Sequence, residues 1–249
     1  MKKILVLPDI HCPNHEERAI KPILSFIKFY NPDYLIQLGD FCDWDSVSSY
    51  GVNSRDEVQL IQHEINSSNA LLSRIDNALR PKTKKIMLAG NHEARYEKFV
   101  SNDSYTLQSR RLKQFSTWHE EYNLKMRNWA YLNYGNNFQI GKLVFTHGWY
   151  CGNSAAKRMA ECFPGRNVIF GHTHQHLIYG CMNEDGNPIE SESIGTLSRF
   201  DLSYLNGKPP VNWIHSFMYI DMENSGNRFT KHFVRIIDGT FIEHGVKFS

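Results

Sequence analysis

Five short patches of the sequence are rich in residues that bind metal ions. Each patch holds Asp, Asn or His, and together they are Asp9-Ile10-His11, Gly39-Asp40-Phe41-Cys42-Asp43, Gly90-Asn91-His92-Glu93, Thr146-His147-Gly148 and Gly171-His172-Thr173-His174. Carboxylate, amide and imidazole groups are common ligands of divalent metals in proteins. So many such groups, with two Asp able to bridge, indicate a site for two metal ions.

Apolar runs that precede the patches predict five buried strands. These runs are residues 4–7, 34–38, 85–89, 143–145 and 168–170. Between them, residues 16–30 and 56–79 place apolar side chains at helical spacing and predict helices. Alternating strands and helices indicate an α/β fold, which gathers its loops and its site at the strand ends. Each of the five strands therefore ends in a candidate ligand.

The remaining sequence predicts two further kinds of structure. Residues 94–135 are dense in basic and aromatic residues and predict a pair of amphipathic helices on the rim. After Gly180 the pattern becomes one of strands and turns. We predict a hairpin turn at 183–187 and strands at 216–222, 229–237 and 240–244. The length of 249 residues suits one domain over 1–249, with a helical insertion at about 94–135.

Composition narrows the class of protein. With 41% hydrophobic and 22% charged residues the chain is typical of a soluble globular protein, and its net charge of +2 does not signal nucleic-acid binding by bulk electrostatics. Five cysteines without a C-x-x-C pair indicate free thiols in a reducing compartment. The first apolar run ends at Pro8, too early for a signal peptide. We therefore expect a cytoplasmic protein with no membrane partner.

In their order along residues 9–174, the five patches resemble the sequence blocks of the calcineurin-like metallophosphoesterases. This resemblance implies the fold of that family, an α/β four-layer α-β-β-α sandwich of two mixed sheets flanked by helices. It also implies a metal-dependent phosphoesterase with two divalent metal ions per chain, Mn²⁺ first and Fe, Zn, Ni, Co or Mg as alternatives. The run from Gly90 to Glu97 resembles small single-domain members of bacteria and bacteriophages. This resemblance implies that the cytoplasm is that of a bacterium, or of the host cell if the protein is phage-encoded.

The resemblance implies which residues hold the two ions. It assigns to one ion Asp9, His11 and His174, and to the other Asn91, His147 and His172. Asp40 would bridge both ions, because a shared carboxylate lowers the repulsion between two dications about 3.5–4 Å apart.

The resemblance also implies roles for residues beside the ligands. His92 would protonate the leaving oxygen or stabilise charge on it, and Asp43 or Glu93 would orient His92 or a ligand imidazole. Asp43 could instead cap a helix. Arg95 would lie near the phosphate or form a surface salt bridge.

We expect hydrolysis of a phosphodiester, a nucleotide or related small phosphoester, by in-line attack of a hydroxide that bridges the two metal ions. Trp44-Asp45 stands after Asp43 where protein serine/threonine phosphatases carry Arg-Gly, which disfavours that class. Three alternatives stay open: a phosphomonoesterase, a nuclease on single-stranded nucleic acid using the basic and aromatic residues of 94–135, and a non-catalytic scaffold. His92 with an intact ligand set favours an enzyme. Candidate substrate contacts in the surrounding loops are Trp44, Tyr50, Tyr96 and Trp149.

Overall fold

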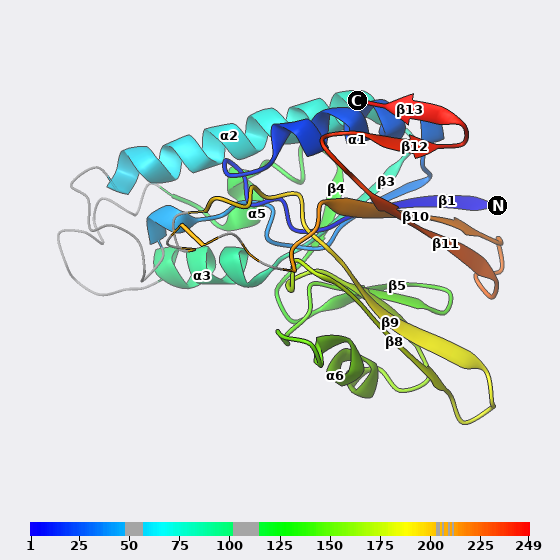
Figure 1. The fold of residues 1–249 in the computed structure, drawn as a ribbon. Coiled ribbons are helices and arrows are strands. Elements are labelled where there is room, and N and C mark those ends of the chain that lie inside the picture. The colour runs from blue at the N-terminus through cyan, green and yellow to red at the C-terminus, as the bar shows by residue number, and fades with distance from the viewer. Residues whose placement is uncertain (48–56, 102–114, 203–204, 206, 209, 211) are drawn as a thin grey trace.

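The structure is a computed structural model, and it describes residues 1–47, 57–101, 115–202, 205, 207–208, 210 and 212–249 (Figure 1). Tyr50, one of the candidate substrate contacts, lies outside the described residues. No helix in these ranges combines the length and the apolar character that a bilayer span requires.

The first of two large sheets carries the N-terminal strand at its centre. Its order is β11-β10-β1-β2-β3-β4. The strands are β1 (Lys2–Leu7), β2 (Tyr34–Gln37), β3 (Lys84–Leu88), β4 (Trp129–Leu132), β10 (Ser216–Met222) and β11 (Phe229–Arg235). Strands β1 to β4 run parallel, whereas β10 and β11 are antiparallel to their neighbours. The sheet is therefore mixed, and the parallel strands end at one common edge.

The second sheet has the order β5-β6-β7-β9-β8. Its strands are β5 (Asn137–Ile140), β6 (Leu143–Thr146), β7 (Asn167–Phe170), β8 (His176–Met182) and β9 (Pro188–Ile194). Strands β6, β7 and β9 are parallel to one another. A separate hairpin of β12 (Phe241–Glu243) and β13 (Val246–Phe248) lies beside α1.

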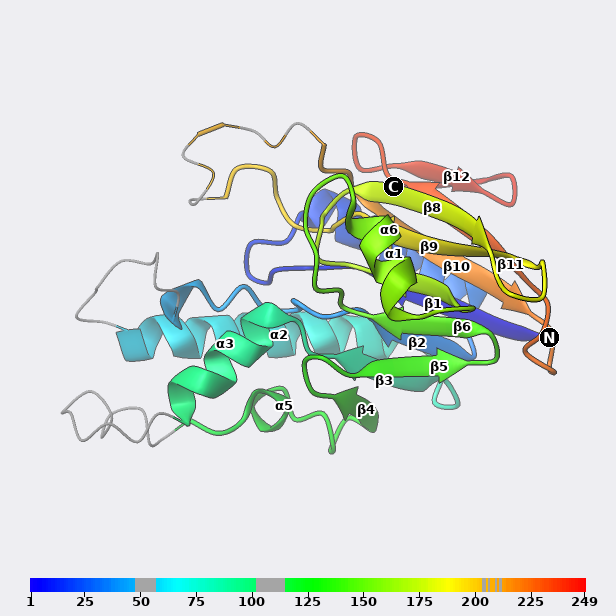
Figure 2. The ribbon, with the colours of Figure 1, turned by 90° about the horizontal axis from the view of Figure 1, so that it is seen from below.

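Helices cover the outer faces of both sheets, which produces four layers (Figures 1 and 2). The helices are α1 (Glu17–Tyr30), α2 (Glu57–Ala78), α3 (Asn91–Val100), α5 (Trp118–Glu121), α6 (Ala155–Cys162) and the short 3-10 helix η1 (Asp45–Val47). Helices α1 and α2 pack on the first sheet, and α6 packs on the second. The predicted four-layer α-β-β-α sandwich is confirmed.

Alternation along β1 shows why the two sheets stack. Leu5 and Leu7 belong to the core beneath the helices, whereas Ile4 and Val6 belong to the core between the sheets. Successive side chains of a strand point to opposite faces, so a continuous apolar run is buried on both. The second sheet contributes Phe145 and Ile169 to the same inter-sheet core.

The predicted elements agree with the structure in most places. All five strands that precede the patches are present, as are the helices near 16–30 and 56–79 and the turn at 183–187 between β8 and β9. The expectation of helices throughout 94–135 is wrong at its C-terminal end, where β4 pairs in parallel with β3. Trp129 is 4% exposed there. Packing of this segment in the sheet outweighs the helical preference that we inferred from its basic and aromatic residues. Strands β5 and β13 and helix α6 were not predicted, and β8 and β9, which flank the predicted hairpin turn, were expected without bounds.

We expect Ile169→Ala to lower the free energy of unfolding by about 2–5 kcal/mol, because this fully buried side chain leaves a cavity between the sheets. Urea unfolding of the metal-free protein measures the change. The matched control is Ile178→Ala, whose side chain on β8 is 57% exposed and should change stability by less than about 0.5 kcal/mol. Equal effects of the two substitutions would contradict an apolar layer between the sheets.

Candidate metal centre

All five patches lie at the same edge of the two sheets, because β1, β2, β3, β6 and β7 end there. The chain turns sharply after these strands. Four non-glycine residues of the patches have positive φ angles, namely His11 (55°), Asp40 (48°), His172 (68°) and His174 (59°). This left-handed region is uncommon for residues other than glycine and is concentrated at functional sites. The surrounding structure thus holds candidate ligands in backbone conformations that a free loop would rarely adopt.

Two glycines of the patches allow backbone and carboxylates to approach closely. A Cβ atom on Gly90 would collide with the carboxylate of Asp40, and one on Gly171 would collide with that of Asp9. Any other residue at these positions would displace an aspartate from the site. The glycines of the Gly-Asn-His and Gly-His-Thr-His patches are therefore part of the geometry of the site.

Asp9, His11 and His174 form the first group of possible metal ligands, with their ligand atoms within 4.8 Å of one another. His174 Nε2 lies 3.1 Å from Asp9 Oδ2 and 3.0 Å from His11 Nε2. The backbone N–H of His172 donates to both oxygens of Asp9, at 3.0 Å each. All three residues are at most 6% exposed, so the group is buried and its carboxylate is held from two sides.

Asp40, His147 and His172 form a second group, and their possible ligand atoms also lie within 4.8 Å of one another. His147 Nε2 lies 3.4 Å from Asp40 Oδ2 and 2.9 Å from the amide oxygen Oδ1 of Asn91. The other ring nitrogen of His147, Nδ1, donates to the backbone oxygen of Leu38 at 3.0 Å. This hydrogen bond directs Nε2 toward the site, as in most metal-bound histidines.

Asp40 lies between the two groups. Its Oδ2 is 3.9 Å from His11 Nε2, in the first group, and 3.4 Å from His147 Nε2, in the second. Burial would raise the pKa of Asp40, but the neighbouring histidines outweigh burial and hold this pKa well below its usual range. Asp40 is therefore an anionic carboxylate in a buried place, which requires cationic partners.

Asp43 joins His92 to the first group. Its Oδ1 accepts from His11 Nδ1 at 2.9 Å and lies 3.3 Å from His92 Nδ1, and its backbone oxygen accepts a hydrogen bond from His92 Nδ1. Asn14 donates to the second carboxylate oxygen, Oδ2. Asp43 thus fixes two imidazole rings at once. It leaves His92 Nε2 facing the site, 3.8 Å from Asp40 Oδ2.

Charge in this corner favours a protonated His92. Burial would lower the pKa of His92, but Asp40 and Asp43 outweigh burial and raise it to about 9. Burial would likewise raise the pKa of Asp43, whereas its hydrogen bonds with His11 and His92 bring it below the usual range. The pair is therefore a carboxylate and an imidazolium in the absence of metal.

Glu93 holds backbone and contacts no imidazole ring through a hydrogen bond among the described residues. Its carboxylate accepts from the backbone N–H groups of Gly90, Asp40, Phe41 and Cys42 at 2.9–3.2 Å and from the hydroxyl of Tyr122 at 3.2 Å. Burial, with the charge of Asp40, raises the pKa of Glu93. Glu93 thus ties the loop after β2 to the start of α3, and so positions Asp40 against Asn91.

The remaining residues that the sequence suggested as substrate contacts differ in how deeply they are buried. Arg95 is half-buried on α3, one turn after Asn91, and its charge acts to lower the pKa of His92. Trp44 and Tyr96 are fully buried and stack on each other at 3.8 Å between ring centroids. Trp149 stacks on Phe163 beside α6. These three aromatic residues therefore pack the loops and do not face the site.

Three residues that lie near the site could not be recognised as site residues from the sequence. The ring of Tyr134 lies 6.1 Å from that of His147, and the ring of Trp213 lies 4.1 Å from that of His174. Cys151 Sγ lies 3.0 Å from His172 Nε2. None of them stands in a ligand-rich patch, so only a three-dimensional structure could reveal them. Tyr134 and Trp213 flank different ligand groups, one on each side of Asp40.

The donor set fits divalent metal ions. Imidazole nitrogens, carboxylate oxygens and one amide oxygen converge in two adjoining groups, and this mixture of N and O ligands suits Mn, Fe, Zn, Ni or Co. His11 and His147 both have Nδ1 engaged by an acceptor and Nε2 turned into the site. That arrangement presents a lone pair to a cation once the imidazole is neutral.

The family model of the calcineurin-like phosphoesterases matches residues 2–176, and the chain belongs to that family. It is accordingly a metal-dependent phosphoesterase. No curated protein matches the chain.

Solved structures with a similar fold share little sequence with this chain. Vps29 from Entamoeba histolytica in complex with Zn²⁺ is 15% identical over 96% of both chains, with a TM-score of 0.46. YfcE, a phosphoesterase from E. coli, is 13% identical over 92% of this chain and 98% of its own, with a TM-score of 0.42. Vps29 from Chaetomium thermophilum is 13% identical over 95% and 92%, with a TM-score of 0.43. Because the TM-scores are below 0.5 and the identities are 15% or less, these similarities support no conclusion about what this chain does.

We expect Glu93→Gln to lower the free energy of unfolding by about 1–3 kcal/mol, because the amide NH₂ cannot accept the backbone N–H groups that one carboxylate oxygen now satisfies. Metal affinity should fall roughly 10- to 100-fold as Asp40 loses its anchor. Urea unfolding and metal titration measure the two effects. Glu161→Gln, an exposed position on α6, is the matched control. Wild-type stability and metal affinity in Glu93→Gln would refute the anchoring role.

Proposed function

We propose that the protein is a phosphodiesterase that uses two divalent metal ions, with Asp40 shared between them. The supporting observation is the position of Asp40 Oδ2, which faces His11 of one ligand group and His147 of the other. Two dications at a phosphoryl site need an anionic bridge, and a buried Asp with a strongly lowered pKa provides one.

In this proposal each ion has three ligands besides Asp40. The first ion is held by Asp9, His11 and His174, and the second by Asn91, His147 and His172. We assign Mn²⁺ as the working metal, with Fe, Zn, Ni, Co and Mg as alternatives for the same ligand types. Bound ions would supply an activated water at neutral pH and positive charge for the phosphoryl oxygens.

His92 is the proposed proton donor to the leaving oxygen. Its Nδ1 donates to the backbone oxygen of Asp43, so a second proton resides on Nε2, the nitrogen that faces Asp40 and the site. The pKa of His92 would fall once Asp40 holds a cation, which eases release of the Nε2 proton. Arg95, one helical turn from Asn91, supplies a further positive charge for the phosphate.

The aromatic residues on both sides of the centre support a substrate with two organic groups on one phosphate. Tyr134 is 37% exposed beside His147, and Trp213 is half-buried beside His174. A phosphodiester has one such group on each side of phosphorus, and a planar nucleobase stacks well on aromatic rings. This arrangement favours nucleotide diesters over a phosphomonoester.

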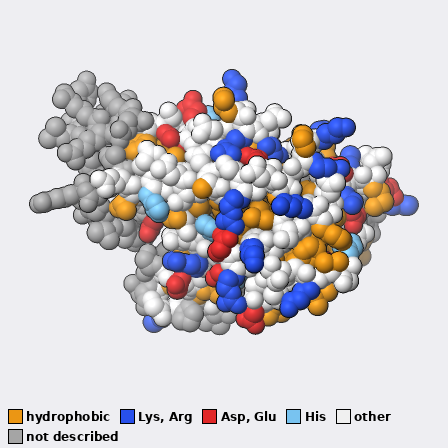
Figure 3. All heavy atoms as spheres, turned by 90° about the horizontal axis from the view of Figure 1, so that it is seen from above, with side chains coloured by type: hydrophobic (Ala, Val, Ile, Leu, Met, Phe, Trp, Pro, Cys, Tyr) orange, Lys and Arg blue, Asp and Glu red, His pale blue; other side chains and the backbone are white. Residues whose placement is uncertain are grey.

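A nucleic-acid polymer is a weaker candidate substrate. Several basic and aromatic residues of 94–135 stabilise the fold. Arg127 donates hydrogen bonds to Asp76 and Asn69. Trp118 and Trp129 are buried. On the face above α1 and α2, Lys and Arg side chains lie scattered among acidic and apolar ones (Figure 3). Among the described residues, which exclude 102–114, neither observation provides the basic track that follows a polyanionic strand.

We expect the purified protein to hydrolyse bis-p-nitrophenyl phosphate when Mn²⁺ is added. His92→Ala should lower kcat by about 10²–10⁴-fold, because it removes the proton donor, while the bound metal content stays the same. Steady-state kinetics and elemental analysis measure both. His63→Ala, at an exposed position on α2, is the control. No turnover with Mn²⁺, Fe²⁺, Ni²⁺, Co²⁺, Zn²⁺ or Mg²⁺ would favour a non-catalytic scaffold.

Asp40→Asn should abolish binding of both ions, since Asp40 is the one ligand that the two sites share in this proposal. Elemental analysis after gel filtration gives the number of ions per chain. Asp185→Asn, in the exposed turn between β8 and β9, should bind metal as the wild type does. The bridging role is wrong if Asp40→Asn retains two ions.

A further inference from the structure

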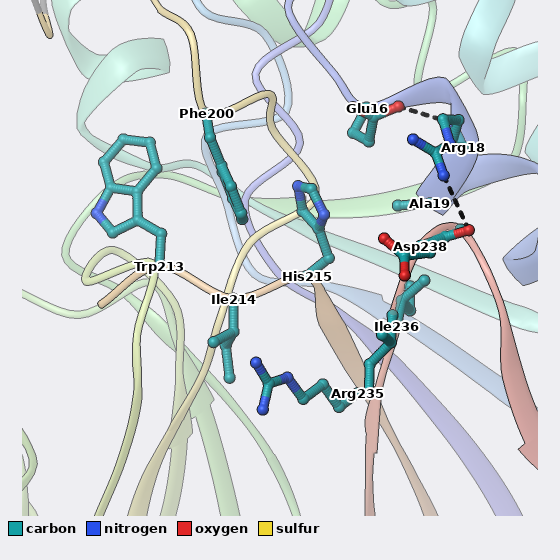
Figure 4. Close-up of a pocket in the computed structure, with 12 residues that line it drawn as sticks. Glu16, Arg18, Ala19, Phe200, Trp213, Ile214, His215, Arg235, Ile236 and Asp238 are labelled. Carbon is teal, nitrogen blue, oxygen red and sulfur yellow. Dashed lines mark hydrogen bonds between the residues drawn. The ribbon is translucent and has the colours of Figure 1, made fainter. Parts of the chain in front are cut away.

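A pocket of about 310 Å³ lies at the same edge of the first sheet as the metal centre. Three parts of the chain form it: the start of α1, Phe200 together with residues 213–215, and residues 235–239 at the end of β11 and just after it (Figure 4). Its volume is at the lower end of the range for small-molecule sites. None of the sequence patches lies in it.

The pocket shares a wall with the metal centre. Trp213 lines the pocket, and its ring packs edge-on against the ring of His174, with centroids 4.1 Å apart. The backbone N–H of Ile214, another lining residue, donates to the backbone oxygen of His174 at 3.1 Å. A molecule in this pocket therefore lies next to the first ligand group.

A stacked pair of aromatic rings lies among the lining residues of the pocket. The ring of Phe200 stacks on that of His215, with centroids 4.0 Å apart and planes 21° apart (Figure 4). His215 Nε2 donates to the backbone oxygen of Ser198 at 2.8 Å, so Nδ1 of the neutral ring is an acceptor, and it has no hydrogen-bond partner among the described residues. Burial lowers the pKa of His215 and keeps the ring neutral.

Charged groups of both signs also line the pocket. Arg18 donates through Nη2 to the backbone oxygen of Asp238 at 3.0 Å, which fixes its guanidinium in the pocket. Arg235, exposed at the end of β11, has no ion pair within the described part of the chain. The carboxylate of Asp238 adds acceptors. Donors, acceptors and a stacking surface in one pocket match the edge and the face of a nucleobase, and a free arginine matches a phosphate.

We propose that this pocket binds a nucleotide, with the base against Phe200 and His215 and a phosphate oxygen near Arg235. Resting on the proposed function, the same pocket would receive the terminal nucleotide of a 5′-phosphorylated dinucleotide, with its 5′-phosphate near Arg235 and the scissile phosphate at the metal centre beyond Trp213.

Binding to the metal-free protein tests the pocket without any catalysis. Isothermal titration should detect adenosine 5′-monophosphate, whereas ribose 5-phosphate, which lacks the base, should bind at least about tenfold more weakly. Phe200→Ala should weaken nucleotide binding about tenfold through lost stacking, and Arg235→Ala about fivefold through a lost phosphate contact. The matched control is Arg199→Ala, which removes an arginine that pairs with Asp201 outside the pocket.

Kinetics with metal-loaded protein tests the second part. Phe200→Ala should lower kcat/KM for a 5′-phosphorylated dinucleotide at least about fivefold relative to kcat/KM for bis-p-nitrophenyl phosphate. Equal binding of nucleotide and ribose 5-phosphate, or nucleotide binding that neither variant changes, overturns the proposal. A protein that binds the nucleotide as expected but hydrolyses no phosphodiester would retain the pocket and refute the diesterase function.

Discussion

The buried carboxylate of Asp40 is the group on which the whole site depends. It is 2% exposed, and histidines around it hold its pKa well below the usual value, so a charge persists where burial opposes charge. Imidazoles offset that charge in the metal-free protein, and cations would offset it in the working enzyme. Strand ends from both sheets lie around this carboxylate. The candidate ligands beside it are therefore far apart in sequence.

A second buried carboxylate keeps the first in place. Glu93 accepts hydrogen bonds from backbone N–H groups of the loop that carries Asp40 and of the turn before Asn91. The hydroxyl of Tyr122 also donates to Glu93. Asp43 does comparable work for His11 and His92. The acidic residues of the patches therefore have three different positions or uses: to lie among the candidate metal ligands, to hold backbone and to orient an imidazole. Their residue types alone do not distinguish these uses.

Aromatic residues show the same division between residue type and location. Trp44 and Tyr96, adjacent to ligand patches in sequence, are stacked in the core beneath the loops. Tyr134 and Trp213, distant from any patch, lie beside His147 and His174. Proximity along the chain is a poor guide to proximity at the site, because a loop after a strand buries its own large side chains to cover the core.

The sequence by itself determined the strands that end in ligands, the order of the five patches and the membership of the chain in a metal-dependent family. These features are local: an apolar run of four or five residues followed by Asp, Asn or His reports both a buried strand and a polar group at its end. Only the tertiary structure decided that β4 belongs to the sheet, that Glu93 binds backbone and that Trp213 separates a pocket from the metal centre. Each of these depends on contacts between residues distant in sequence, whose free energy no single segment encodes.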